Sequence, residues 1–328
     1  MIFLCIADVY ASRAWRLTRI IDSAVPAYLC ASREYRLVVQ WGFVMQDIRS
    51  QAMRTLKTAF AGASVAMLLC ASTCFAQTVR VKSMVYNDSG LKADLFELAG
   101  SSGNAKLPAV ILLHAGGWSG ADRSEFTAFG TWLARQSVVP IAIDYRVPSA
   151  ATPWPTPLMD AASAVWFVRE NAKRLQIDPN RVVILGASAG GHLAAMLATG
   201  EIKSRLGTSS RPNLLIALWA PWDLTKPNVG GDGRDLLQLL TGVTDAKDAS
   251  PLLRITDAMP PTLIIQGKDD SIVPPIQALT ACEAIVAARR QCQLVALDEG
   301  HGAKKKASVE EVAKQVASFL TRFYPKDR

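Results

Sequence analysis

The chain has 328 residues, half of them hydrophobic and 20% charged. This composition excludes a disordered chain, which is too polar to form a core, and a fibrous chain, which is repetitive. The 36 Lys+Arg against 28 Asp+Glu give a net charge of +8 without a basic block, so no nucleic-acid partner is expected. Six cysteines in a chain of this length exclude a disulfide-framework miniprotein, and their spacing fits no zinc site.

Residues 53–76 have the three parts of a secretory signal peptide. Arg54 and Lys57 form a basic start, an apolar run follows, and Cys74 and Ala76 are the small residues before the expected cleavage site. The apolar run is shorter than the ~20 residues of a membrane-spanning helix, so no stable membrane insertion is expected after cleavage. A buried core helix is the alternative. We therefore expect a periplasmic or secreted protein consisting of residues 77–328.

Because a signal peptide belongs at the N-terminus, residues 1–52 are predicted to be an upstream extension, with Met45 or Met53 as the true start. This extension and the signal peptide together hold eight of the Lys+Arg and four of the Asp+Glu, which leaves the mature chain with a net charge of +4. Of the six cysteines, only Cys282 and Cys292 belong to the mature chain. In an oxidising compartment they can form a disulfide, and two separate buried thiols are the alternative.

From residue 78 onward, short apolar runs alternate with segments of helical periodicity. The runs predict strands at 78–86, 93–98, 109–114, 138–145, 181–187, 214–220, 262–267 and 292–298. The periodic segments predict helices at 124–136, 158–175, 189–199 and 309–323. Ser308 and Glu311 have the spacing of a capping box before the last helix. The alternation predicts an α/β fold with a mostly parallel central sheet, helices on both faces and a small cap or lid insertion at 222–258.

The segment Gly186-Ala187-Ser188-Ala189-Gly190 lies where an apolar strand passes into a helix. A nucleophile elbow requires this context, because its tight turn needs small neighbours and exposes the serine above the sheet. The helix that follows directs its N-terminus toward the same point and favours developing negative charge there. An ordinary glycine-rich turn is the alternative. We predict that Ser188 is a catalytic nucleophile.

A serine nucleophile needs a general base, and the chain has three histidines. His114 ends a strand, and His192 follows Ser188 by one helical turn, where it is expected to face away or pack beneath the site. His301 lies in a loop after a strand, from which it can reach the serine, so it is the predicted base. Asp270 is favoured over Asp269 as the carboxylate that orients it. Ser188, Asp270 and His301 then follow the chain order of an α/β-hydrolase triad.

The third strand is followed by His114-Ala115-Gly116-Gly117-Trp118. Glycines allow backbone N–H groups to approach a substrate closely, so Gly116 and Gly117, with Ala189 as third donor, are predicted to form an oxyanion hole. A simple turn is the alternative. Tryptophans near the motifs are candidates for a substrate pocket, although packing is their commoner role; they are Trp118, Trp154, Trp219 and Trp222.

These motifs resemble those of α/β-hydrolase esterases of the hormone-sensitive-lipase type, and most closely the bacterial branch that includes bifunctional feruloyl/acetyl-xylan esterases. The resemblance covers residues 90–325 and is carried by HAGGW (114–118), DYR (144–146), GASAGGHLA (186–194), GKDDSIVP (267–274) and GHG (300–302). It implies hydrolysis of carboxylic esters, on small molecules or polysaccharides, without a metal or organic cofactor. Ala115 and Gln266 depart from it, since glycine and histidine are frequent at those positions.

Two other functions share this fold. A serine peptidase of the prolyl-oligopeptidase kind is the first, but such enzymes usually carry a large N-terminal propeller, for which this chain has no room. A non-catalytic binding protein is the second, and the complete set of triad and oxyanion motifs argues against it. Fold alone does not decide among these functions. We therefore expect a carboxylesterase that acts on short acyl esters.

Overall fold

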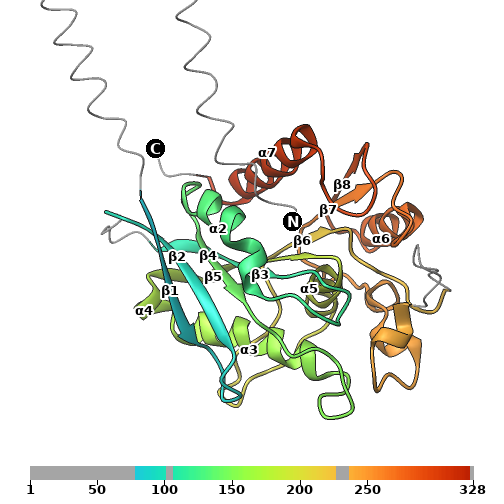
Figure 1. Cartoon of the computed structure of the whole chain (residues 1–328), viewed down its shortest axis with the longest axis horizontal. Coiled ribbons are helices and arrows are strands. Elements are labelled where there is room, and N and C mark those ends of the chain that lie inside the picture. Colours follow the sequence, from blue (N-terminus) through green and yellow to red (C-terminus); the bar gives the residue numbers. More distant parts are fainter. Residues whose placement is uncertain (1–77, 101–105, 227–235, 326–328) are drawn as a thin grey trace, which may run out of the picture. The chain divides into compact units, whose positions relative to one another are not determined.

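The computed structural model describes residues 78–100, 106–226 and 236–325 (Figure 1). The predicted upstream extension and signal peptide lie outside these ranges and stay predictions. Within the described ranges, eight strands form one sheet in the order β1-β2-β4-β3-β5-β6-β7-β8. They are β1 (Val79–Val85), β2 (Lys92–Leu98), β3 (Leu107–Leu113), β4 (Val139–Ile143), β5 (Ile177–Ala187), β6 (Leu214–Leu218), β7 (Thr262–Gly267) and β8 (Cys292–Leu297).

The inner strands are mainly apolar because most of their residues are buried on both faces of the sheet. Strands β3, β4, β5, β6, β7 and β8 pair in parallel, whereas β1 and β2 form an antiparallel hairpin and β2 also pairs antiparallel with β4. Every residue of β6 and β7 is buried, whereas most of β1, at the edge, is exposed. Continuous apolar runs in the centre and polar residues at the edge are typical of such a sheet. The predicted α/β-hydrolase architecture is confirmed.

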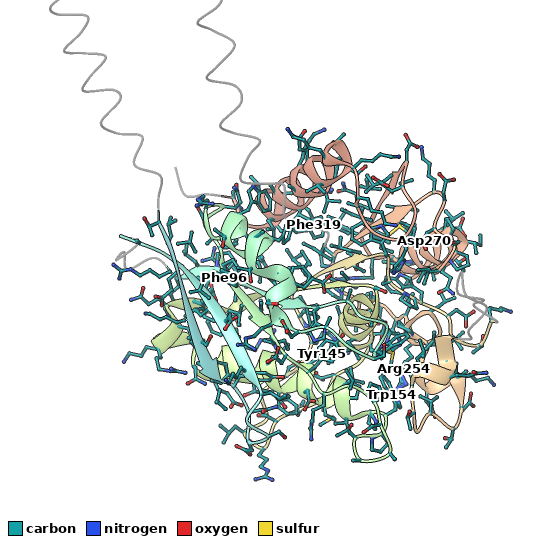
Figure 2. All side chains as sticks on the ribbon, in the orientation of Figure 1. Phe96, Tyr145, Trp154, Arg254, Asp270 and Phe319 are labelled. Carbon is teal, nitrogen blue, oxygen red and sulfur yellow. A yellow bond between two sulfur atoms is a disulfide. The ribbon has the colours of Figure 1, made fainter. Side chains whose placement is uncertain are left out.

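Helices cover both faces of the sheet. One apolar cluster joins the sheet to α3 (Thr156–Glu170), α5 (Ala189–Thr199) and α6 (Pro275–Ala287), and a second joins it to α2 (Thr127–Ala134) and α7 (Lys306–Phe323). Phe96 of β2 and Phe319 of α7, both labelled in Figure 2, belong to the second cluster. Within the described ranges, none of the helices has the length and apolarity required to cross a membrane.

Two predicted helices differ from the structure. The segment predicted as one helix at 158–175 is interrupted at Asn171, after which a short α4 (Ala172–Leu175) ends at Gln176 in the left-handed region. The segment at 124–136 begins as the 3-10 helix η2 (Arg123–Phe126) before α2.

The capping box prediction at Ser308 is wrong, because α7 already begins at Lys306. The backbone N–H of Lys305 donates instead to the carboxylate of Glu299, at 2.8 Å. Burial opposes ionisation of Glu299, but this hydrogen bond and one from Ser308 lower its pKa. A carboxylate from the preceding loop therefore caps the helix, and it also fixes the loop that contains His301.

The insertion predicted at 222–258 contains three short 3-10 helices among its described residues: η3 (Leu236–Leu239), η4 (Ala246–Ala249) and η5 (Pro251–Arg254). Leu240 and Ala249 are buried in a small apolar cluster with Trp118 and Ala189. The carbonyl of Thr241 accepts a hydrogen bond from the N–H of Trp154 at 2.7 Å. The insertion therefore packs against the loops at the carboxyl ends of the strands, and its action as a lid stays a prediction.

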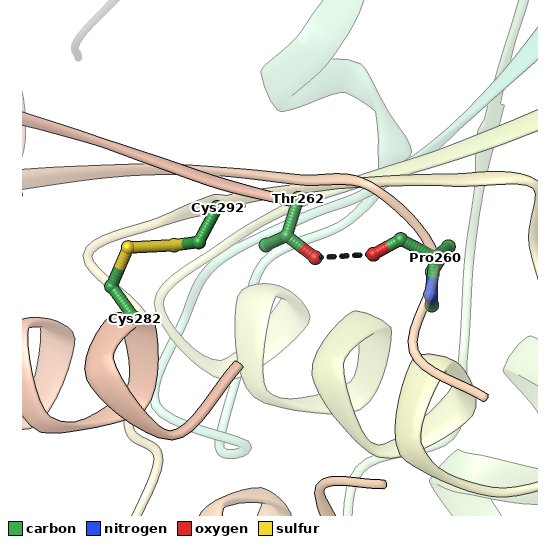
Figure 3. The surroundings of a disulfide bond; sticks show 4 residues. All are labelled: Pro260, Thr262, Cys282 and Cys292. Carbon is green, nitrogen blue, oxygen red and sulfur yellow. Dashed lines mark hydrogen bonds between the residues drawn. A yellow bond between two sulfur atoms is a disulfide. The ribbon is translucent and has the colours of Figure 1, made fainter. Parts of the chain in front are cut away.

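Cys282 and Cys292 form a disulfide, which answers the alternative left open by the sequence (Figure 3). The bond joins α6 to the first residue of β8, with the two Cα atoms 5.6 Å apart. The strand β8 is the last in the sheet and pairs with β7. The cross-link therefore fastens the end of the sheet to the helix that covers it.

Removal of this disulfide in a Cys282→Ser/Cys292→Ser variant is expected to destabilise the protein. Closing a loop of this length restricts the unfolded chain and contributes about 3 kcal/mol. In a domain of this size the loss corresponds to a decrease in Tm of roughly 5–10 °C. Thermal unfolding followed by circular dichroism measures the effect. Reductant should lower the Tm of the wild type and leave that of the variant unchanged. Equal Tm values for the wild type and the variant, each with and without reductant, would contradict the cross-link.

Candidate active site

Ser188 occupies the turn between β5 and α5 in a strained conformation. Its φ is 51° and its ψ is −116°, in a region that L-residues seldom adopt. The turn is possible because Gly190 has no side chain: a Cβ there would lie 2.2 Å from the carbonyl oxygen of Leu113, at the end of β3. The first turn of α5 thus rests directly on the end of the neighbouring strand. This contact brings the serine and the loop after β3 together.

The three residues of the predicted triad form one hydrogen-bonded chain. His301 Nε2 lies 2.8 Å from Ser188 Oγ, and His301 Nδ1 lies 2.8 Å from Asp270 Oδ2. An ionised carboxylate only accepts hydrogen bonds, so Nδ1 carries the proton and Nε2 is free to accept one from the serine. The side chain of Asp270 is fully buried, whereas that of His301 is 20% exposed. The imidazole therefore has the tautomer and position of a general base.

Asp270 is held by several donors besides His301. The backbone N–H groups of Ile272 and Val273 donate to its Oδ1 at 2.9 and 2.8 Å. The side-chain amide of Gln266 donates to Oδ2 at 2.8 Å and to the carbonyl of Val273 at 3.0 Å. These bonds fix the carboxylate in one orientation and stabilise its charge. The sequence analysis identified Gln266 only as a departure from the family pattern and missed its role. The signal that could have revealed it is a polar residue at the end of an apolar strand, four positions before Asp270.

Two of the predicted oxyanion residues belong to the loop after β3, and the third directly follows the serine. Gly116 and Gly117 both have positive φ values, 109° and 58°. A Cβ on Gly116 would lie 1.8 Å from the carbonyl oxygen of Gly120, so the loop closes on itself only with glycine at this position. Ala189 begins α5 and is buried. Its N–H is one of the first in the helix, and such groups have no partner within the helix.

The loop that carries the two glycines is anchored by residues outside the motif. Glu125 accepts a hydrogen bond from the N–H of Ala115 at 2.8 Å. The hydroxyl of Tyr145 donates to the carbonyl of His114 at 2.8 Å, and the two rings stack at 4.0 Å (Tyr145 is labelled in Figure 2). Burial lowers the pKa of His114, which favours the neutral ring. His114 is therefore a support of the loop, and the DYR motif supplies its partner.

His192 is fully buried and belongs to the packing beneath the serine, in agreement with the sequence. Its Nε2 lies 2.7 Å from the carbonyl oxygen of Ala249, in the insertion. Burial lowers its pKa to about 4, so the ring is neutral at the pH at which esters are ordinarily hydrolysed. His192 thus has no contact that would let it act as the base in place of His301.

The tryptophans predicted to line a pocket are mostly core residues. Trp222 has no exposed surface and packs between the sheet and the helices on one face, so the prediction for it is wrong. Trp118 and Trp219 are 2% and 3% exposed. Trp154, labelled in Figure 2, is partly exposed and packs against the small cluster that contains Trp118. Large aromatic side chains after strand ends fill the space between loops, which explains the error.

Two curated relatives are named as esterases. LipC of Mycobacterium tuberculosis is 27% identical over 237 residues, which is 66% of this chain and 59% of LipC. The carboxylesterase NlhH of the same species is 34% identical over 178 residues, 52% of this chain and 54% of NlhH. The chain spans between half and three fifths of the length of these curated relatives.

The chain also matches solved structures, and each match covers almost the whole of the solved chain. Esterase 2 of Thermogutta terrifontis, phosphonylated by sarin, has a TM-score of 0.67 and 26% identity, over 75% of this chain and 97% of that one. An acetyl ester-xyloside bifunctional hydrolase from Caldicellulosiruptor lactoaceticus shares the fold with a TM-score of 0.66 and 23% identity, over 76% of this chain and 98% of that one. A family model described as BD-FAE matches residues 96–285, which is more than half of the chain. The chain therefore belongs to the BD-FAE family.

Proposed function

We propose that this protein is a serine carboxylic-ester hydrolase. The observation that carries the proposal is the continuous hydrogen-bonded chain from Ser188 through His301 to the buried Asp270. An arrangement of this kind activates a hydroxyl that is otherwise a poor nucleophile. The esterase names of the relatives support ester hydrolysis over peptide hydrolysis. A binding protein that makes no use of the chemistry has no need for this geometry.

The proposed reaction is acyl transfer in two halves. Ser188 Oγ attacks the ester carbonyl while His301 Nε2 takes its proton, and a C–O bond forms as the carbonyl becomes an oxyanion. The N–H groups of Gly116, Gly117 and Ala189 stabilise that charge. The bond to the alcohol then breaks, and His301 returns its proton to the leaving oxygen. Water repeats the sequence on the acyl-enzyme and releases the acid and the free serine.

Short acyl groups are the proposed substrates. Leu239 of the insertion approaches the oxyanion loop, with its Cδ1 4.0 Å from a Cβ placed on Gly117. A side chain at this distance limits the room beside the reacting carbonyl. The Thermogutta terrifontis esterase has been solved with butyrate bound and with propionate bound, both short acids. Acetyl or feruloyl groups on polysaccharides are the proposed natural esters, in keeping with the resemblance to feruloyl/acetyl-xylan esterases.

Replacement of the nucleophile in Ser188→Ala is expected to abolish ester hydrolysis. Loss of a triad member in serine hydrolases lowers kcat by about 10⁴–10⁶-fold, because the acyl-enzyme cannot form. Release of p-nitrophenol from acetate, butyrate and longer esters measures the rate. Ser163→Ala, which removes a hydroxyl that bonds within α3, is the matched control and should retain full activity. Turnover by Ser188→Ala at the wild-type rate would exclude the proposed nucleophile.

Loss of the amide in Gln266→Leu is expected to lower kcat about tenfold while the protein stays folded. One hydrogen bond to the carboxylate contributes about 1.5 kcal/mol to its placement, which is about a tenfold change in rate. Steady-state kinetics on p-nitrophenyl acetate test the change. Gln293→Leu provides a control, because Gln293 on β8 bonds to Gln315 of α7. Equal kcat values for the two variants would show that Gln266 does not support the triad.

Export to an oxidising compartment is also proposed. The three-part pattern of residues 53–76 supports it, and so does the disulfide, since such bonds persist mainly outside the cytosol. N-terminal sequencing of the protein recovered from the native host should find Gln77 as the first residue. A mature N-terminus near Ile2 would contradict both the start and the cleavage site.

A further inference from the structure

His192 connects three segments that are distant in the sequence. It is fully buried in the first turns of α5, and its backbone N–H donates to the carbonyl of Ser188 at 2.9 Å. Its ring Nε2 reaches the carbonyl of Ala249 at 2.7 Å, in η4 of the insertion. Its ring also contacts two tryptophans, Trp118 of the oxyanion loop and Trp154 of the loop before α3.

The hydrogen bond to Ala249 fixes the tautomer of the ring. A carbonyl oxygen accepts hydrogen bonds and cannot donate them, so the proton of the neutral His192 is on Nε2. Nδ1 is then an acceptor, and it is buried without a hydrogen-bond partner among the described residues. Burial keeps the ring neutral, in agreement with a pKa of about 4. The interactions of the His192 side chain are therefore the hydrogen bond of Nε2 and the contacts of the ring with Trp118 and Trp154.

The contact with Trp118 places His192 against the oxyanion loop. The two rings meet edge to face, with their centroids 5.1 Å apart and an interplanar angle of 89°. Trp118 directly follows Gly117 and has a φ of 54°, a conformation that persists only when the surroundings hold it. Trp118 is 2% exposed and belongs to the same apolar cluster as Ala189 and Leu240.

We propose that His192 is a positioning residue for the oxyanion hole. Its bond to Ala249 and its packing against Trp118 clamp the insertion and the glycine loop onto the N-terminal turn of α5. The N–H groups of Gly117 and Ala189 belong to two different segments, and stabilisation of an oxyanion requires both at a fixed distance from it. Among the described residues, the side chain of His192 forms no hydrogen bond with the triad, and it acts through Trp118. This inference rests on the proposed esterase function.

The test compares His192→Leu with His192→Gln in the full chain. Gln has a side-chain N–H at a reach similar to that of Nε2, whereas Leu has no donor. In His192→Leu we expect kcat for p-nitrophenyl acetate to fall about tenfold with KM nearly unchanged, because a misplaced donor affects the transition state more than the ground state. The Ki of phenylboronic acid, which forms a tetrahedral adduct with the serine, should rise by a similar factor. His192→Gln should recover most of both values.

Rates are to be expressed per active site, counted by titration with paraoxon, so that misfolded protein does not contribute. Met196→Leu is the matched control, since Met196 is a buried residue one turn further along α5 that packs in the core. If His192→Leu has the kcat per site and the Ki of this control, the positioning role is overturned. If the wild type hydrolyses no ester at all, the proposed function fails instead, and the two outcomes are distinguishable.

Discussion

The close approach of α5 to the end of β3 determines the rest of the site. Gly190 lies so near the carbonyl of Leu113 that any side chain there would overlap it. This contact permits a turn of a single residue between β5 and α5, and that residue is Ser188, held at a positive φ. The same contact brings the loop after β3 to the serine. Backbone packing thus brings the loop of the proposed oxyanion donors to the proposed nucleophile.

The other groups reach the serine because the strands are parallel. In a parallel sheet the loops after successive strands meet at one edge, and β3, β5, β7 and β8 each contribute one loop. Asp270 follows β7 and His301 follows β8. Each loop has its own support: Glu125 and Tyr145 for the glycine loop, Gln266 for the carboxylate, and Glu299 for the loop of the histidine. Catalytic groups held by such supports need little reorganisation during the reaction.

The sequence predicted those features of the fold that depend on local patterns. Runs such as residues 109–113 identify inner strands because burial on both faces requires continuous apolar residues, and the elbow is recognisable because its glycines are sterically required. Contacts across the fold could not be predicted in this way. The start of α7 depends on a hydrogen bond to Glu299 that no periodicity reveals, and the burial of Trp222 depends on which elements cover it. The partner of His192 lies 57 residues away in a segment without periodicity.

The disulfide has a consequence for local unfolding. Within the described part of the chain, β8 pairs with β7 and forms the end of the sheet. Terminal strands are ordinarily the first to open, since they have hydrogen bonds on one side and few buried contacts. The bond between Cys282 and Cys292 obliges β8 to move together with α6. His301 follows β8 and Asp270 precedes α6, so an opening that separates His301 from Asp270 is coupled to the loss of a packed helix. Amide hydrogen exchange in β8 should therefore be as slow as that in α6.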